Sequence, residues 1–179
     1  SPAFKRWFGG SKVVDEKGEP LTVYHGSPSR FTEFGIDKAG SRTDSGYLGE
    51  GFYFSSREHA SLYANAPREG AGNHAADAEW AGEPYIPNGG HSALYPSHLS
   101  LQNPLELYER PNPDAPHQGQ DREVHIREFL GLPRTATAKE VTQAAKASGH
   151  DGVVFTYAHG NSIREGAPRW LGDKEYVAF

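Results

Sequence analysis

The sequence predicts a single α+β domain in which short strands alternate with short helices. The chain has 179 residues, which is long enough for one hydrophobic core and short for two. Helix-initiation signals recur along the chain, and the apolar runs between them are too short to be core helices. No sequence repeat is apparent, so we expect residues 1–179 to form one unit.

Composition excludes several classes of function. The chain carries 18 Lys and Arg against 23 Asp and Glu, a net charge of -5, and so has no overall basic surface for a polyanion. It has no cysteine, which excludes disulfide frameworks, thiolate zinc sites and cysteine nucleophiles. The nine histidines show no metal-ligand spacing, so we expect no metal. No apolar run approaches the roughly 18 residues of a membrane span and no signal-peptide pattern is present, so we expect a soluble domain.

The N-terminal part predicts a helix followed by a pair of strands. Residues 1–8 predict a short helix capped by Ser1, with aromatic side chains on one face, that ends at Gly9-Gly10. Residues 13–24 predict two strands joined by a turn at Gly18, which sets the sequence Tyr-His-Gly-Ser at the end of a strand. Residues 28–51 are rich in Gly, Ser and Asp and predict a mobile loop.

A strand and a helix are predicted next, in residues 51–64. Gly51 to Phe54 has the composition of a buried strand, and the Ser-x-x-Glu spacing after it predicts a helix that begins at Ser55 or Ser56. Tyr63 would project from a helix face whose other members are alanines, which leaves space for a flat ring. Residues 66–92 predict a loop or insertion.

Further elements are predicted in the C-terminal half. They are strands at 94–101 and 105–108 with a break at Pro104, a helix that begins at a capping box in 137–140 and ends at Gly149, and strands at 152–156 and 175–179. Residues 109–122 are polar and proline-rich. In the last strand, alternation places Glu175, Val177 and Phe179 on one face.

Chemically useful side chains occur in three segments: His25 beside Gly26, Tyr53 followed by Tyr63, and Glu175. Taken singly, such a histidine is usually structural, an aromatic strand residue is usually core and a strand glutamate is usually exposed. Their order is more informative. His-Gly-Ser after a strand, Gly-x-Tyr-Phe-Ser before a helix with Ala-x-x-Tyr, and Glu-Tyr-Val in a late strand together resemble the His-Tyr-Glu branch of the ADP-ribosyltransferase superfamily, the branch of diphtheria toxin and the poly(ADP-ribose) polymerases.

The resemblance spans residues 21–179 and implies a fold and a site. The fold would be two small packed antiparallel β-sheets with peripheral helices, and the co-substrate would be NAD. Glu175 would be the catalytic carboxylate that stabilises the ribosyl cation, with His25 and Tyr53 also in the catalytic set. Nicotinamide would stack between Tyr53 and Tyr63 while the Gly26 backbone binds its carboxamide. The residues implied in NAD binding are His25, Gly26, Ser27, Tyr53, Ser55 and Tyr63.

Two positions depart from the family pattern. Members that elongate polymers commonly have a serine three positions before the second tyrosine, where this chain has Ala60, with Ser61 one step away. Asp173, two residues before Glu175, is similar to one half of the paired acidic motif of arginine-modifying relatives. The arginine and the Ser-Thr-Ser segment of that branch have no counterpart in this chain, so we interpret Asp173 as a surface residue.

We therefore expect mono-ADP-ribosyl transfer from NAD to an unidentified protein, nucleic acid or small molecule. The N-terminal stretch also resembles domains embedded in bacterial toxin and phage or mobile-element polyproteins. It suggests a monomeric toxin or effector that acts in a cytoplasm as part of a larger polypeptide, with an immunity or host protein as a further partner. The alternatives are an NAD glycohydrolase and a non-catalytic module that binds NAD or a partner. Transfer to nucleic acid would need a local basic path, and the candidates for it are Lys5, Arg6, Lys12, Arg30, Lys38 and Arg42.

Overall fold

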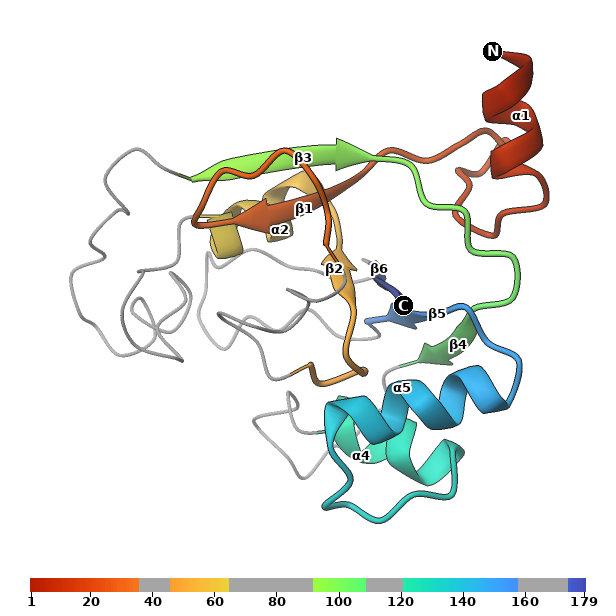
Figure 1. The fold of residues 1–179 in the computed structure, drawn as a ribbon, viewed down its shortest axis with the longest axis vertical. Helices are drawn as coiled ribbons and strands as arrows, with labels where there is room; N and C mark the ends of the chain where they lie inside the picture. The colour runs from red at the N-terminus through yellow and green to blue at the C-terminus, as the bar shows by residue number, and fades with distance from the viewer. Residues whose placement is uncertain (36–45, 65–91, 109–120, 158–173) are drawn as a thin grey trace.

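The computed structural model describes residues 1–35, 46–64, 92–108, 121–157 and 174–179. Their secondary structure elements are short helices interspersed with short strands (Figure 1). In chain order they are α1 (Pro2–Phe8), β1 (Val23–Ser27), β2 (Phe52–Phe54), α2 (Arg57–Ala64), β3 (Ala93–Ser97), β4 (Leu105–Tyr108), α4 (Asp121–Phe129), α5 (Ala138–Ala147), β5 (Gly152–Thr156) and β6 (Lys174–Ala178).

The strands form two small sheets. β1 pairs with β3 in the smaller sheet, and the larger sheet has the order β2-β6-β5-β4. α2 lies beside β1 and β3, whereas α4 and α5 lie at the opposite end of the molecule, near β4 and β5 (Figure 1). The predicted α+β class, with two small sheets and peripheral helices, is confirmed.

One strand pair differs from the expected antiparallel arrangement. β6 runs antiparallel to both of its neighbours, but β4 and β5 are parallel, so the larger sheet is mixed. The segment between these two strands includes α4 and α5, and parallel strands need such a long crossover connection. The expectation that both sheets are wholly antiparallel is therefore wrong at this pair.

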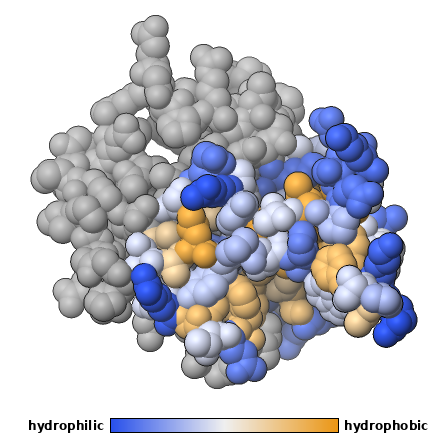
Figure 2. Space-filling view, turned by 90° about the horizontal axis from the view of Figure 1, so that it is seen from above, coloured by the Kyte–Doolittle hydropathy of each residue, from blue (hydrophilic) through white to orange (hydrophobic). Residues whose placement is uncertain are grey.

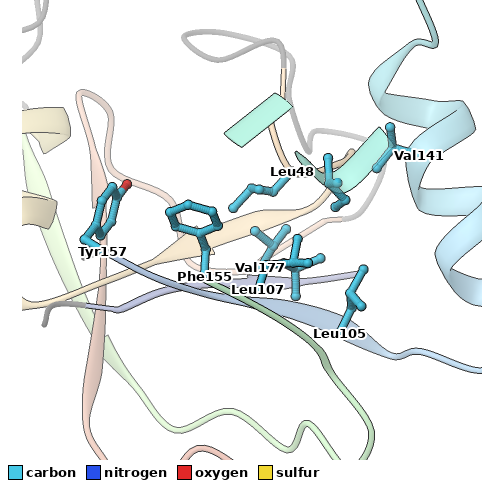
Figure 3. Close-up of a cluster of buried hydrophobic side chains, with 9 residues drawn as sticks. Leu48, Leu105, Leu107, Val141, Phe155, Tyr157 and Val177 are labelled. Carbon is cyan, nitrogen blue, oxygen red and sulfur yellow. The ribbon is translucent and has the colours of Figure 1, made fainter. Parts of the chain in front are cut away.

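The two central strands of the larger sheet, β5 and β6, are buried on both faces. Side chains alternate along β6, so Glu175 and Val177 face one side while Tyr176 and Ala178 face the other. The first face packs against α5 in a cluster that Figure 3 shows from Tyr157 to Val141. The second face packs against side chains of residues 13–23 and 99–101. The sheet thus lies between two apolar clusters and contributes side chains to both.

Local signals in the sequence predicted the helix ends well. Ser1 Oγ accepts a hydrogen bond from the Phe4 amide at 3.2 Å, and α1 ends at Gly9. Thr137 and Glu140 form the predicted capping box of α5. α2 begins directly after Ser56, whose Oγ accepts from the His59 amide at 3.3 Å, so the second serine caps this helix.

Strand limits and one helix differ from the predictions. β1 continues through Ser27, so His25 and Gly26 lie within a strand instead of beyond its end, and β3 ends at Ser97. α4 was not predicted, because its sequence DREVHIREF is mostly polar and has a weak apolar period. The predictions for residues 36–45, 66–91 and 109–120, and for Asp173, lie outside the described residues.

The surface shows no single dominant apolar face in the described ranges. Figure 2 shows separate hydrophobic patches between hydrophilic residues on the side seen from above. The large hydrophobic side chains that are exposed come from different elements and include Trp7, Tyr108 and Phe129. Within the described ranges, no helix is both long and apolar enough to cross a membrane.

β1 and α2 approach so closely that the contact requires a glycine. A Cβ placed on Gly26 would overlap the Ala60 carbonyl oxygen and would lie 2.9 Å from the Ala64 backbone nitrogen. Ala60 and Ala64 are buried, and their small side chains let the helix backbone reach the strand. Because the atoms in the way belong to the backbone, any side chain at Gly26 must push α2 away from β1.

We expect Gly26→Ala to lower the free energy of unfolding by about 2 kcal/mol, the usual scale for overpacking a tight contact. Urea denaturation followed by tryptophan fluorescence measures the difference. Gly10→Ala is the matched control, because a Cβ there meets only the flexible Gln102 side chain, at 3.2 Å from its Oε1. Equal losses in the two variants would mean that the close approach of α2 to β1 is unimportant.

Candidate active site

β6 carries Glu175 into the first apolar cluster. Its side chain is only 4% exposed and, among the described residues, it is the one buried acidic side chain. It pairs with Phe155 across the sheet and shares a face with Val177. The Tyr157 hydroxyl donates a hydrogen bond to Glu175 Oε2 at 2.9 Å. A glutamate held in this way is unlike the usual exposed glutamate of a strand.

β2 places Tyr53 on the same face as Glu175. Tyr53 pairs with Val177, the residue two positions beyond Glu175 in β6. The Tyr53 hydroxyl donates to the Gly49 carbonyl at 2.8 Å and accepts from the Leu48 amide at 3.0 Å. These bonds tie the ring to the turn at 46–49, where Gly46 and Gly49 have φ of 77° and 115°. The glycines allow the backbone of that turn to adopt these angles.

β1 holds His25 beside β2. His25 Nδ1 lies 2.8 Å from the Tyr53 carbonyl oxygen, which can only accept, so Nδ1 carries the proton and Nε2 is left as an acceptor. Burial lowers the pKa of His25 from its ordinary value of 6.5, and the bond to Tyr53 opposes this effect in part. The imidazole is therefore neutral near pH 7. The rings around it are those of Phe31, Phe34, Phe52, Phe54 and Tyr95.

The N–H and C=O of Gly26 point to the side of β1 where β2 lies, but at a position beyond the end of β2. Antiparallel partners alternate between hydrogen-bonded and non-hydrogen-bonded pairs. Tyr24 lies opposite Pro96, which has no N–H, and instead exchanges two backbone hydrogen bonds of 2.9 Å with Ser55. Gly26, two residues further, directs its N–H and C=O toward the same side. A donor and an acceptor side by side match the donor and acceptor of a primary amide.

Ser27 and Ser55 are buried and bond to nearby backbone atoms. Ser27 Oγ accepts from the Ser29 amide at 3.2 Å, which leaves its hydroxyl proton as a donor on the face of β1 that carries His25. Ser55 Oγ donates to the Ser56 carbonyl at 3.3 Å. One step beyond the Phe54–Tyr176 pair, the register sets Ser55 level with Glu175. Ser55 thus bonds to β1 through its backbone and lies level with Glu175 in β6.

α2 brings Tyr63 into contact with the Glu175 side of the sheet. The ring of His59 lies 5.5 Å from that of Tyr63 and 6.0 Å from that of Tyr157, measured between centroids. Contacts therefore run from Tyr63 through His59 and Tyr157 to Glu175. Neither His59 nor Tyr157 is among the site residues predicted from the sequence. The two-residue period of β5 places Tyr157 on the same face as Phe155, but its approach to Glu175 also depends on the pairing of β5 with β6.

The departure from the family pattern at Ala60 is not compensated by Ser61. Ser61 Oγ donates to the carbonyls of Arg57 and Glu58, at 2.9 and 2.8 Å, so its hydroxyl bonds to its own helix. Ala60 is buried where the helix meets Gly26. Ser61 therefore does not replace the family serine that bonds to the nicotinamide carboxamide.

The described residues contain no group of three or more His, Cys, Asp or Glu side chains that could hold a metal ion. Three of the implied NAD-binding positions lie next to one another along β1, at His25, Gly26 and Ser27. Tyr53 and Ser55 bond to this strand through their backbone atoms, and Tyr63 is linked to Glu175 through side-chain contacts. The residues nominated from separate segments are thus connected.

Comparison with known protein families identifies the family of this chain. The model of a family described as ADP-ribosyltransferase in polyvalent proteins matches residues 15–179, which include every residue of the candidate site. No curated protein and no solved structure matches the chain. The predicted membership of the ADP-ribosyltransferase superfamily is confirmed by this match over most of the chain. This protein belongs to the ADP-ribosyltransferase family found in polyvalent proteins.

Proposed function

We propose that the domain is a mono-ADP-ribosyltransferase that cleaves NAD at its nicotinamide glycosidic bond and passes ADP-ribose to an acceptor. The observation that carries the proposal is the buried Glu175 carboxylate, which shares a sheet face with Tyr53 and is linked through Tyr157 and His59 to Tyr63. Membership of the ADP-ribosyltransferase family supports NAD as the co-substrate.

The nicotinamide half of NAD would bind at the edge of β1. Tyr53 and Tyr63 would cover the two faces of the cationic ring, each contributing on the order of 1 kcal/mol. The Gly26 N–H would donate to the carboxamide oxygen, and the Gly26 C=O would accept from the carboxamide nitrogen. This backbone pair fixes the ring in one orientation, because turning the amide over would set donor against donor.

The ribose hydroxyls would bind on the other face of β1. His25 Nε2 is an acceptor because Nδ1 donates its proton to the Tyr53 carbonyl. Ser27 lies on the same face and can donate. Together they offer one acceptor and one donor to a pair of neighbouring hydroxyls. His25 would thus position NAD without exchanging a proton with it.

The reaction would proceed by loss of nicotinamide from the ribose C1′. The C1′–N bond breaks, and its electron pair stays on the nitrogen and neutralises the pyridinium ring. Positive charge then develops on the ribose, as in glycoside hydrolysis. Glu175 would accept a hydrogen bond from the 2′-OH and stabilise that charge more than it stabilises bound NAD. The acceptor forms the new bond to C1′ and releases a proton.

The biological role would follow from the context of the family. The matching family occurs in polyvalent proteins, which supports action as one part of a longer polypeptide. We propose a toxin or effector that modifies a cytoplasmic target, with an immunity or host protein as a further partner. The acceptor would be a protein, a nucleic acid or a small molecule, and the experiment that follows identifies it.

Glu175→Gln is expected to slow nicotinamide release by about a hundredfold, the usual effect of removing one electrostatic stabiliser of a transition state. The domain is incubated in a cell lysate with NAD labelled on its adenylate part. Nicotinamide release and the fate of the label are then followed. Wild type should release nicotinamide and transfer the label to a defined acceptor, while NAD binding by the variant stays within a few fold of wild type.

Glu106→Gln is the matched control, because Glu106 is an exposed carboxylate in the same sheet. It should leave turnover unchanged. Label recovered only as free ADP-ribose would identify an NAD glycohydrolase. If wild type releases no nicotinamide in any lysate, both ADP-ribosyl transfer and NAD hydrolysis are refuted. The remaining function would be non-catalytic binding of NAD or a partner.

Acid should weaken NAD binding through His25. The pKa of His25 is lowered by burial, so the neutral form persists somewhat below pH 6.5 and Nε2 then becomes protonated as the pH falls further. A protonated Nε2 cannot accept from a ribose hydroxyl. We expect the KM for NAD to rise about fivefold through this window, which corresponds to one neutral hydrogen bond. Steady-state kinetics between pH 5 and 8 measures the change.

His25→Asn should remove this pH dependence, because an amide does not titrate. His98→Asn is the matched control: His98 Nδ1 also bonds a backbone carbonyl, that of Leu21 at 3.0 Å, but the side chain is exposed and lies away from the site. The unfolded chain takes up the His25 proton more readily than the folded one, so stability also falls below pH 6.5. A pH profile that is unchanged in His25→Asn would contradict the assigned role.

A further inference from the structure

We propose that Tyr157 is a positioning residue that orients the Glu175 carboxylate toward the ribose 2′-OH. This inference rests on the proposed function of Glu175 and adds a residue to it. Tyr157 follows the last residue of β5 and shares a sheet face with Phe155, which lies opposite Glu175. It therefore reaches Glu175 diagonally across the strand pair, at the end of the row of core side chains in Figure 3.

The hydrogen bond between the two residues is shielded from solvent. Tyr157 is 2% exposed and Glu175 is 4% exposed, and 2.9 Å separates the hydroxyl oxygen from Glu175 Oε2. A buried carboxylate that loses a donor must rotate toward another polar group or draw in water. With Tyr157 in place, Oε2 is held toward the Tyr157 hydroxyl. The carboxylate keeps acceptor positions for the ribose 2′-OH.

The Tyr157 ring is itself held from two sides. Phe155 packs against it with centroids 5.3 Å apart and planes at 74°, and His59 of α2 packs against it at 6.0 Å and 63°. Both contacts have the edge-to-face geometry that aromatic rings favour. A ring that cannot turn fixes the direction of its hydroxyl. The direction of the bond to Glu175 is thus set by β5 and α2 together.

This arrangement links the orientation of the carboxylate to the helix that carries Tyr63. His59 contacts both the Tyr63 ring and the Tyr157 ring. Correct seating of α2 against β1 would therefore align the nicotinamide stack and Glu175 at once. Small errors in the placement of a charged group cost large factors in rate, because the stabilising interaction has to be present in the transition state.

A double-mutant cycle of Tyr157→Phe and Glu175→Gln tests the proposal. Tyr157→Phe keeps the ring and removes only the hydroxyl. It should lower kcat for nicotinamide release about tenfold, which corresponds to about 1.4 kcal/mol, with the KM for NAD within twofold of wild type. In the Glu175→Gln background the same substitution should have no further effect on kcat, because its target carboxylate is already gone.

Tyr176→Phe is the matched control, since it removes a buried tyrosine hydroxyl from the opposite face of β6 and should leave kcat unchanged. Two outcomes would overturn the inference while the proposed function stands: an unchanged kcat in Tyr157→Phe, or a tenfold loss of equal size in both backgrounds, which would indicate a general structural effect. Absence of nicotinamide release from wild type would refute the proposed function and this inference with it.

Discussion

Two backbone hydrogen bonds between Tyr24 and Ser55 join the small sheet to the large one, and the site is arranged around them. Each of the two residues serves as donor and as acceptor, so β1 is fixed in direction and in register relative to β2. The bond from His25 to the Tyr53 carbonyl adds a side-chain link at the next position. β2 ends at Phe54, and Ser55 makes the last backbone bonds to β1. The N–H and C=O of Gly26, which point to the same side of β1 as those of Tyr24, therefore lie beyond the end of β2, near α2.

The site also contains buried polar side chains, and burying each of them costs free energy. Glu175 and His25 lie in apolar surroundings, and each has a hydrogen-bond partner on a neighbouring strand. In the case of His25, the partner is a backbone carbonyl that cannot move independently of the sheet. Such partners let a fold keep chemically active groups in low-dielectric surroundings, where electrostatic interactions are strong. The rigid strands supply the geometry that loops alone would not hold.

The sequence predicted the parts of the structure that are determined by interactions between residues close together in the chain. The caps of α1 and α5 and the start of α2 follow from contacts between residues three or four apart, and they were located correctly. The parallel pairing of β4 with β5 depends on long-range contacts and was missed. The order of His25, Tyr53, Tyr63 and Glu175 was informative only as a family pattern. Tyr157 escaped notice because its partner is 18 positions away in the chain, and nothing local distinguishes it from a core tyrosine.

The double use of Gly26 limits how this protein can change over time. The missing side chain makes room for the α2 backbone, while the peptide groups on the other side are turned toward the sheet edge. A mutation that adds a side chain here would displace α2, and under the proposed function it would also disturb the binding of nicotinamide. We therefore expect sequence variation among such domains to fall on the side chains around the glycine. The strand itself stays as a fixed template.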